Sequence, residues 1–202
     1  MITPLLLALL VTQPAPDRLP ERSLVDGWRH ALSLGWVGTS LWSKEDSQYT
    51  VHSLAASYLM STADSGVFLH VSFLFPLQVR QDGNAYAAGD FYSPALGLDL
   101  LVGWEWRWEL PGRIELEAGP GLHASLLTLT GKANIQSFNA APLGIGGEVI
   151  GRWRPGVNAG GAALSVGVVV APTIDFWDPL HSSQLKIGLS LRAGVAVGLD
   201  LP

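Results

Sequence analysis

Residues 101–119 read LVGWEWRWELPGRIELEAG, and this stretch decides the fold. Tryptophan alternates there with charged side chains, in the order Trp104, Glu105, Trp106, Arg107, Trp108 and Glu109. Because successive side chains of a β-strand point to opposite faces, the alternation predicts a strand with one tryptophan-rich face and one charged face. The Pro111-Gly112 pair that follows is typical of a turn, and the alternation resumes after it.

The same period of two recurs along most of the chain. Eight segments carry it, at residues 28–42, 49–61, 66–80, 94–110, 113–130, 141–154, 162–176 and 184–201. The longer connections, at 43–48, 81–93, 131–140 and 177–183, fall at one end of these segments, and shorter turns at 62–65, 111–112 and 155–161 fall at the other. We therefore predict an all-β fold, an eight-stranded antiparallel up-and-down transmembrane β-barrel.

Three prolines lie inside the predicted strands. Pro76, Pro120 and Pro172 each remove one donor from the hydrogen-bond ladder. The alternation continues unchanged past Pro76 and Pro120, so we expect no bulge at either position.

The composition of the two faces indicates which face meets lipid. Charged residues make up only 14% of the chain, against about 25% for an ordinary soluble domain. The face opposite the aliphatic one is mostly Gly, Ala and Ser with isolated charges, which is typical of a narrow lumen and not of a surface in water. The interpretation is a membrane barrel that is apolar outside; a soluble lipocalin-like binding barrel, polar outside, is the alternative.

All sixteen charged residues of the eight segments fall on the predicted lumen face. The positive ones are Arg29, Arg80, Arg107, Arg113, Arg152, Arg154, Lys186 and Arg192. The negative ones are Asp99, Glu105, Glu109, Glu115, Glu117, Glu148, Asp175 and Asp200. Because an unpaired buried charge costs several kcal/mol, the equal numbers predict a paired network that plugs the lumen.

Large aromatic side chains gather toward the strand ends on the apolar face. We predict that they form the aromatic girdles of a membrane barrel, at Trp28, Trp42, Tyr58, Trp104, Trp106, Trp108, Trp153 and Phe176. His30 and His52 share this face, and we expect them to be interfacial side chains and not metal ligands.

The N-terminus contains a short apolar stretch, residues 5–11, of the length found in an export signal. We expect a signal peptide over 1–15, a proline-rich linker over 16–26 and the barrel domain over 27–202; a short buried N-terminal segment is the alternative. The chain has no cysteine, which excludes disulfides and a Cys-based metal site. No basic cluster suggests nucleic acid, and we expect no metal and no cofactor.

The run from Trp28 to Leu201 resembles the small eight-stranded outer-membrane barrels of the OmpA transmembrane-domain, OmpX and OmpW kind. Stretches such as LEAGPGLHASL (116–126) and APLGIGGEVIGRW (141–153) look like strands of that class. The resemblance implies a bacterial outer-membrane location, the lipid bilayer as partner, a monomer, and a structural or surface-interacting role. It also leaves open an OmpW-like passage of small or hydrophobic solutes, and contact with lipopolysaccharide or a small solute.

One motif points to chemistry. His123-Ala124-Ser125 matches the His-x-Ser spacing of the lipid A 3-O-deacylases. This resemblance implies an acyl hydrolase with a serine nucleophile. Leu126 stands where that family commonly has Asn, no Glu follows in the next loop, and the alternation turns both side chains into the lumen. We therefore predict that the protein is not an enzyme and that His123 is a hydrogen-bonding residue of the lumen.

Overall fold

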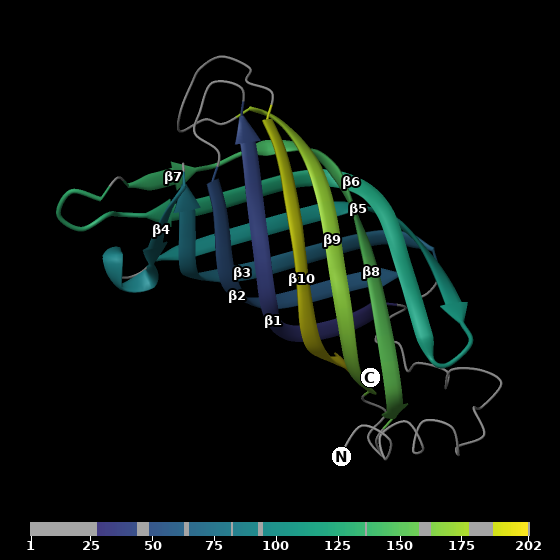
Figure 1. The fold of residues 1–202 in the computed structure, drawn as a ribbon. Coiled ribbons are helices and arrows are strands. Elements are labelled where there is room, and N and C mark those ends of the chain that lie inside the picture. The colour runs from purple at the N-terminus through teal and green to yellow at the C-terminus, as the bar shows by residue number, and fades with distance from the viewer. Residues whose placement is uncertain are drawn as a thin grey trace, which may run out of the picture.

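The computed structural model describes residues 28–43, 49–62, 65–81, 83–92, 95–135, 137–157, 163–177 and 188–201. Eight long strands form a closed antiparallel barrel (Figure 1): β1 Trp28–Ser43, β2 Tyr49–Thr62, β3 Gly66–Gln81, β5 Leu96–Leu110, β6 Ile114–Leu129, β8 Leu143–Val157, β9 Ala163–Trp177 and β10 Gly188–Leu201. Each pairs with the long strands before and after it in the chain, and β1 pairs with β10 to close the sheet. The predicted all-β, eight-stranded antiparallel up-and-down barrel is confirmed.

The alternation seen in the sequence separates the two faces of the barrel wall. Leu34 and Leu122 on the outer face are 70% and 67% exposed. Asp99 and Glu115 on the inner face are 4% and 1% exposed. The barrel is therefore apolar outside and polar inside, the reverse of a soluble calyx. None of the helices in the described part of the chain is long and apolar enough to cross a membrane.

The prediction of unbroken alternation past Pro76 is wrong. Ser53 pairs with Pro76 while the adjacent His52 pairs with Gln78, so Leu77 is an extra residue in β3, a bulge. Proline has no backbone N–H to donate, and the extra residue lets regular pairing resume beyond it. The faces of β3 exchange at this point.

Pro120 behaves as expected. The pairing of β5 with β6 keeps one register on both sides of it, from Gly103↔Gly121 to Trp106↔Ala118. The pairing of β6 with β8 also runs through Pro120, which lies opposite Gly147. This proline is accommodated without an extra residue.

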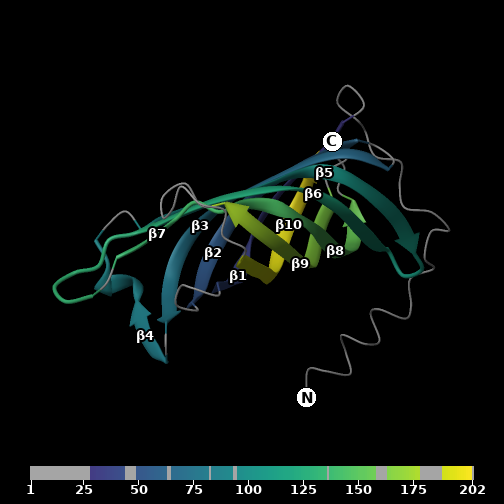
Figure 2. The same cartoon turned by 90° about the horizontal axis from the view of Figure 1, so that it is seen from above.

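Two of the predicted loops contain short regular elements. The 81–93 connection holds β4 Asn84–Ala87 and the 3₁₀ helix η1 Ala88–Asp90, and the 131–140 connection holds β7 Phe138–Ala140. β4 extends the pairing of β3, and β7 extends that of β6. These elements project from one end of the barrel (Figure 2), which we call the loop end; the opposite end, with the Pro111-Gly112 turn, is the turn end.

Candidate functional site

Two layers of buried charge cross the lumen. The first layer lies toward the turn end and contains Arg29, Glu105, Arg107, Glu115, Glu117, Arg152, Arg154 and Asp200. Four arginines and four carboxylates make it electrically balanced. The side chains come from β1, β5, β6, β8 and β10, so the layer ties strands from all around the barrel.

Glu115 and Glu117 are the centre of the first layer. They are two residues apart on β6, so both point inward. Glu115 Oε1 accepts hydrogen bonds from Nη2 of Arg29 at 3.0 Å and from Nη2 of Arg154 at 2.6 Å. Glu117 Oε1 accepts one from Nε of Arg107 at 2.9 Å. Charge-assisted bonds of this kind are the strong ones in a low-dielectric interior.

The strand register places these opposite charges together. Arg107 of β5 lies directly opposite Glu117 of β6, and Arg152 of β8 lies directly opposite Glu115. Arg152 then reaches across to Glu117, with Nη2 and Oε2 2.9 Å apart. Cross-strand neighbours stand about 4.5–5.5 Å apart at Cβ, which long side chains bridge easily.

The second layer lies nearer the loop end and contains His70, Asp99, His123, Glu148, Asp175 and Arg192. Arg192 of β10 donates to Asp99 through Nη1, and through Nη2 to Glu148 Oε2 at 3.2 Å. His70 Nδ1 lies 2.7 Å from the same Glu148 oxygen. One continuous chain of contacts thus joins β3, β5, β8 and β10 across the lumen.

His123 lies between two carboxylates. Its Nε2 is 3.1 Å from Asp99 Oδ2, and its Nδ1 is 3.0 Å from Asp175 Oδ1. Both ring nitrogens are therefore engaged, and neither is directed at a hydroxyl that it could deprotonate. Ser125 shares the inner face of β6, and its backbone N–H donates to Pro142 O at 3.0 Å. In this geometry both nitrogens of His123 lie beside carboxylates and not beside the Ser125 hydroxyl.

One group of apolar side chains lies between the two charged layers, and another lies toward the loop end. Ile150 lies between Glu148 of the second layer and Arg152 of the first along the inner face of β8. It packs in a buried cluster with Leu59, Phe68 and Leu101. Toward the loop end lies a second buried cluster, made of Val51, Val79, Phe91, Leu127 and Leu129. Two lumen cavities have volumes of about 50 Å³ and about 10 Å³.

Three described residues that were predicted for the network lie apart from these layers. Arg80 is on the outer face, because the Leu77 bulge exchanges the two faces of β3, so that prediction is wrong. Glu109 is exposed at the end of β5. Arg113 has a positive φ of 63° in the turn, and its Nη1 donates to Pro155 O. Lys186 lies outside the described residues.

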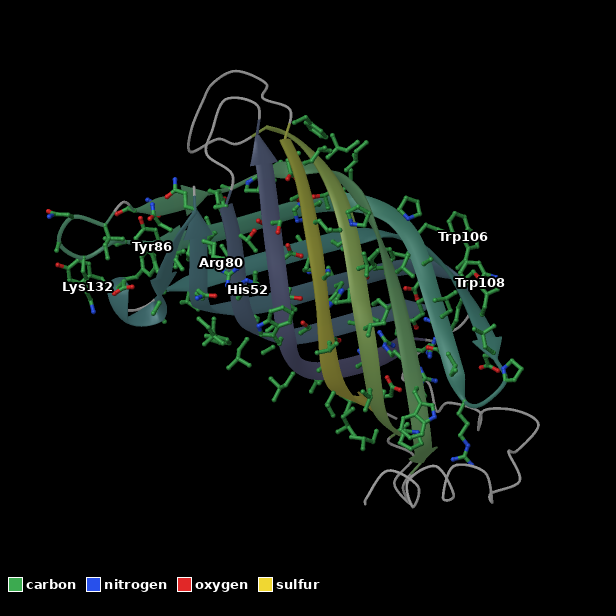
Figure 3. The ribbon with its side chains drawn as sticks, in the orientation of Figure 1. His52, Arg80, Tyr86, Trp106, Trp108 and Lys132 are labelled. Carbon is green, nitrogen blue, oxygen red and sulfur yellow. The ribbon has the colours of Figure 1, made fainter. Side chains whose placement is uncertain are left out.

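The predicted girdle residues lie on the outer face where their side chains are described. Trp106 and Trp108 are exposed and point away from the barrel near the turn end (Figure 3). Trp104, Trp153 and Phe176 are also exposed, Trp28 and Tyr58 are half-buried, and the side chain of Trp42 lies outside the described residues.

The two outward histidines have aromatic partners. His30 Nδ1 lies 2.6 Å from the Tyr58 hydroxyl. The His52 ring stacks on Trp36 with centroids 5.2 Å apart. The alternation of β1 places Trp36 on the apolar face, but its mid-strand position gave no reason to include it in a girdle.

No family model and no curated protein matches the sequence. Among solved structures, the chain is similar to Neisserial surface protein A, with 8% identity over 87% of this chain and 96% of that one and a TM-score of 0.49. It is also similar to the outer membrane protein OprG of Pseudomonas aeruginosa, with 10% identity over 86% and 96% and a TM-score of 0.46. A third similarity is to the translocator domain of the autotransporter NalP of Neisseria meningitidis, with 11% identity over 96% and 92% and a TM-score of 0.30.

Proposed function

We propose that the chain is a small integral barrel of the bacterial outer membrane, with a structural or surface-interacting role and a lumen closed by its ion pairs. The observation that carries this proposal is the sidedness of the wall, with leucine, valine and tryptophan exposed outside and charge buried inside. Monomeric proteins in water rarely expose apolar patches larger than a few hundred Å². A closed barrel also leaves no unpaired strand edge in lipid.

The length of the strands fits a bilayer. The eight long strands have 14 to 16 residues, and a tilted strand needs about 9–11 to cross the hydrocarbon core. The outer face also becomes polar where the apolar belt should end. Beyond the Leu77 bulge it carries Arg80, opposite Thr50 of β2, and Gln78, opposite His52. We place this polar band at the outer head groups, since loops are longer on the external side of such barrels.

The closed lumen is proposed in preference to solute passage. A solute would have to separate both charged layers and the apolar cluster between them. Leaving one partner of a buried ion pair alone costs about 3–5 kcal/mol, so opening several pairs at once is strongly unfavourable. A cavity of about 10 Å³ has the volume that one water needs. The wider cavity of about 50 Å³ holds a few waters and no larger solute.

Two measurements test this proposal. The folded chain in detergent should migrate faster than the boiled chain in gel electrophoresis, because a closed barrel stays compact until it is heated. In planar bilayers the same protein should give no steady discrete openings. Steady openings that disappear in Arg107→Glu, while heat-modifiable migration persists, would overturn the closed lumen. A chain that is monodisperse in plain buffer would overturn the membrane barrel itself.

We propose no hydrolytic role for Ser125. The engagement of both His123 nitrogens by carboxylates supports this, because a serine nucleophile needs a free base nitrogen within reach. Mass spectrometry of lipid A from cells that produce the wild type or Ser125→Ala should give the same acyl pattern. Loss of one acyl chain with the wild type alone would overturn the proposal.

A further inference from the structure

An apolar groove crosses the outer face of the barrel. Its volume is about 1000 Å³, and residues of β5, β6, β8, β9 and β10 line it. It lies on the lipid-facing side of the wall, so it is separate from the charged lumen. The inward side chains of the two charged layers, Arg192 and Glu148 among them, do not line it.

One wall of the groove is a single row of side chains that face each other across five strands. The register pairs Val102 with Leu122, Leu122 with Ile145, Ile145 with Ile174, and Ile174 with Leu189. All five side chains are exposed on the outer face. Because directly opposed residues lie on the same face, the row is continuous and wholly apolar.

The floor is bare backbone. Gly103, Gly121 and Gly146 are neighbours across β5, β6 and β8. The chains approach too closely there for any side chain, since a Cβ on Gly103 would lie 2.0 Å from the Pro120 carbonyl oxygen. A Cβ on Gly146 would lie 2.5 Å from Thr173 Cγ2. Thr173 and Ser190, which continue this row across β9 and β10, are buried on the inner face, so the whole floor is strand backbone.

The second wall contains two of the prolines that lie within strands. Pro120 and Pro172 are exposed on the outer face, and Leu191 lies directly opposite Pro172. Gly147, which pairs with Pro120, has no side chain and leaves the space between the two prolines open. The groove thus has two apolar walls and a floor of strand backbone.

The length and direction of the groove indicate what fills it. Five adjacent strands span four spacings, or about 19 Å. An acyl chain in one leaflet spans about 15 Å, half of a hydrocarbon core about 30 Å thick. The row starts at Val102, opposite Leu69 near the turn end of β3, and finishes at Leu189, opposite Trp42 near the loop end of β1. A chain lying in the groove would therefore reach the rim at the loop end.

From these features we infer that the groove binds one acyl chain of a membrane lipid whose head group lies at the loop end. This inference rests on the membrane location proposed above, because lipid is then the medium that contacts this wall. A chain in the groove touches protein on three sides, whereas a chain on the convex wall elsewhere touches it on one. The bound lipid should therefore exchange more slowly than its neighbours and remain during detergent extraction.

Native mass spectrometry of the full chain, refolded in phosphatidylethanolamine vesicles and then extracted in mild detergent, tests the inference. The wild type should retain one phospholipid. Leu122→Trp places a larger ring in the groove and should reduce the retained fraction at least tenfold. Leu34→Trp on β1 is the matched control, since Leu34 is equally exposed and does not line the groove, and it should retain the lipid.

The other outcomes are distinguishable. The inference that the groove binds an acyl chain is overturned if all three proteins retain the phospholipid equally. It is also overturned if the wild type retains none although its migration is heat-modifiable. Both outcomes leave the proposed membrane barrel unaffected. A dimer mass that Leu122→Trp abolishes also overturns the groove inference, because the groove would then hold a second copy of the chain. Failure of heat-modifiable migration in the wild type overturns the membrane proposal, and the groove inference falls with it.

Discussion

Arg107 Nε and Glu117 Oε1 lie 2.9 Å apart and directly opposite each other, on neighbouring strands joined by the Pro111-Gly112 turn. The same guanidinium contacts Glu105 at 2.5 Å and donates to the backbone carbonyl of Thr62 at 3.2 Å. The alternation that places tryptophan on the outer face of β5 therefore places the ion-paired residues of the same strand in the lumen. In the β5–β6 hairpin one alternating sequence pattern thus supplies both the apolar outer face and the charged side chains that fill the lumen.

Removal of one carboxylate from the first layer should destabilise the barrel. In Glu117→Gln the buried side chains of Arg107 and Arg152 each lose one charged partner, while Arg107 keeps Glu105 and Arg152 keeps Asp200. The substitution should therefore cost about 1.5–3 kcal/mol, the range for a hydrogen bond to a charged group. Equilibrium urea unfolding in phospholipid vesicles measures the change. Glu109→Gln, an exposed residue at the end of the same hairpin, is the control and should stay within about 0.5 kcal/mol. Equal effects of the two variants would contradict the paired layer.

His123 should matter for stability and its neighbour Ser125 should not. His123→Ala leaves Asp99 and Asp175 without their shared partner and should cost roughly 1–3 kcal/mol, the penalty for unsatisfied buried groups. Ser125→Ala removes a side-chain hydroxyl that does not contact His123, and should cost less than about 1 kcal/mol. Urea titration of both variants in vesicles checks this. A larger cost for Ser125→Ala would show that the hydroxyl belongs to the buried network.

The Leu77 bulge makes a prediction about accessibility. The chain has no cysteine, so single substitutions can be labelled cleanly. Arg80→Cys should react with a membrane-impermeant maleimide on intact cells, because the bulge turns residue 80 outward near the loop end. Val79→Cys, one residue away and 1% exposed, should stay unlabelled until the barrel is unfolded. The reverse pattern would mean that β3 continues without a bulge.

Depth in the bilayer can be measured on the outer face. Leu34 lies at the middle of β1, and Trp108 lies two residues from the turn end of β5. Arginine on the lipid face costs about 2–4 kcal/mol at the midplane and about 0–1 kcal/mol near the interface. Leu34→Arg should therefore destabilise folding in vesicles far more than Trp108→Arg. Similar costs at both positions would contradict the proposed girdle at the turn end.

Much of the barrel could be predicted from the sequence because alternation is a local property. Residues two apart in a strand share a face regardless of the rest of the chain, so the alternation of Trp104, Glu105 and Trp106 already predicts which face meets lipid. The equal numbers of positive and negative charges predicted a paired network in the lumen, because a buried charge requires a partner. The eight strands and the sidedness of their wall followed from these local rules.

The tertiary structure decided which charged residues form pairs and where the alternation of inward and outward side chains is interrupted. Arg192 meets Asp99 only because β10 and β5 face each other across a closed lumen, and no spacing in the sequence encodes that contact. Arg80 points outward only because β3 takes up an extra residue where Pro76 has no N–H to offer β2. Local sequence determines the face of each residue within a strand, whereas register, closure and the lost hydrogen bonds of proline determine which faces come together.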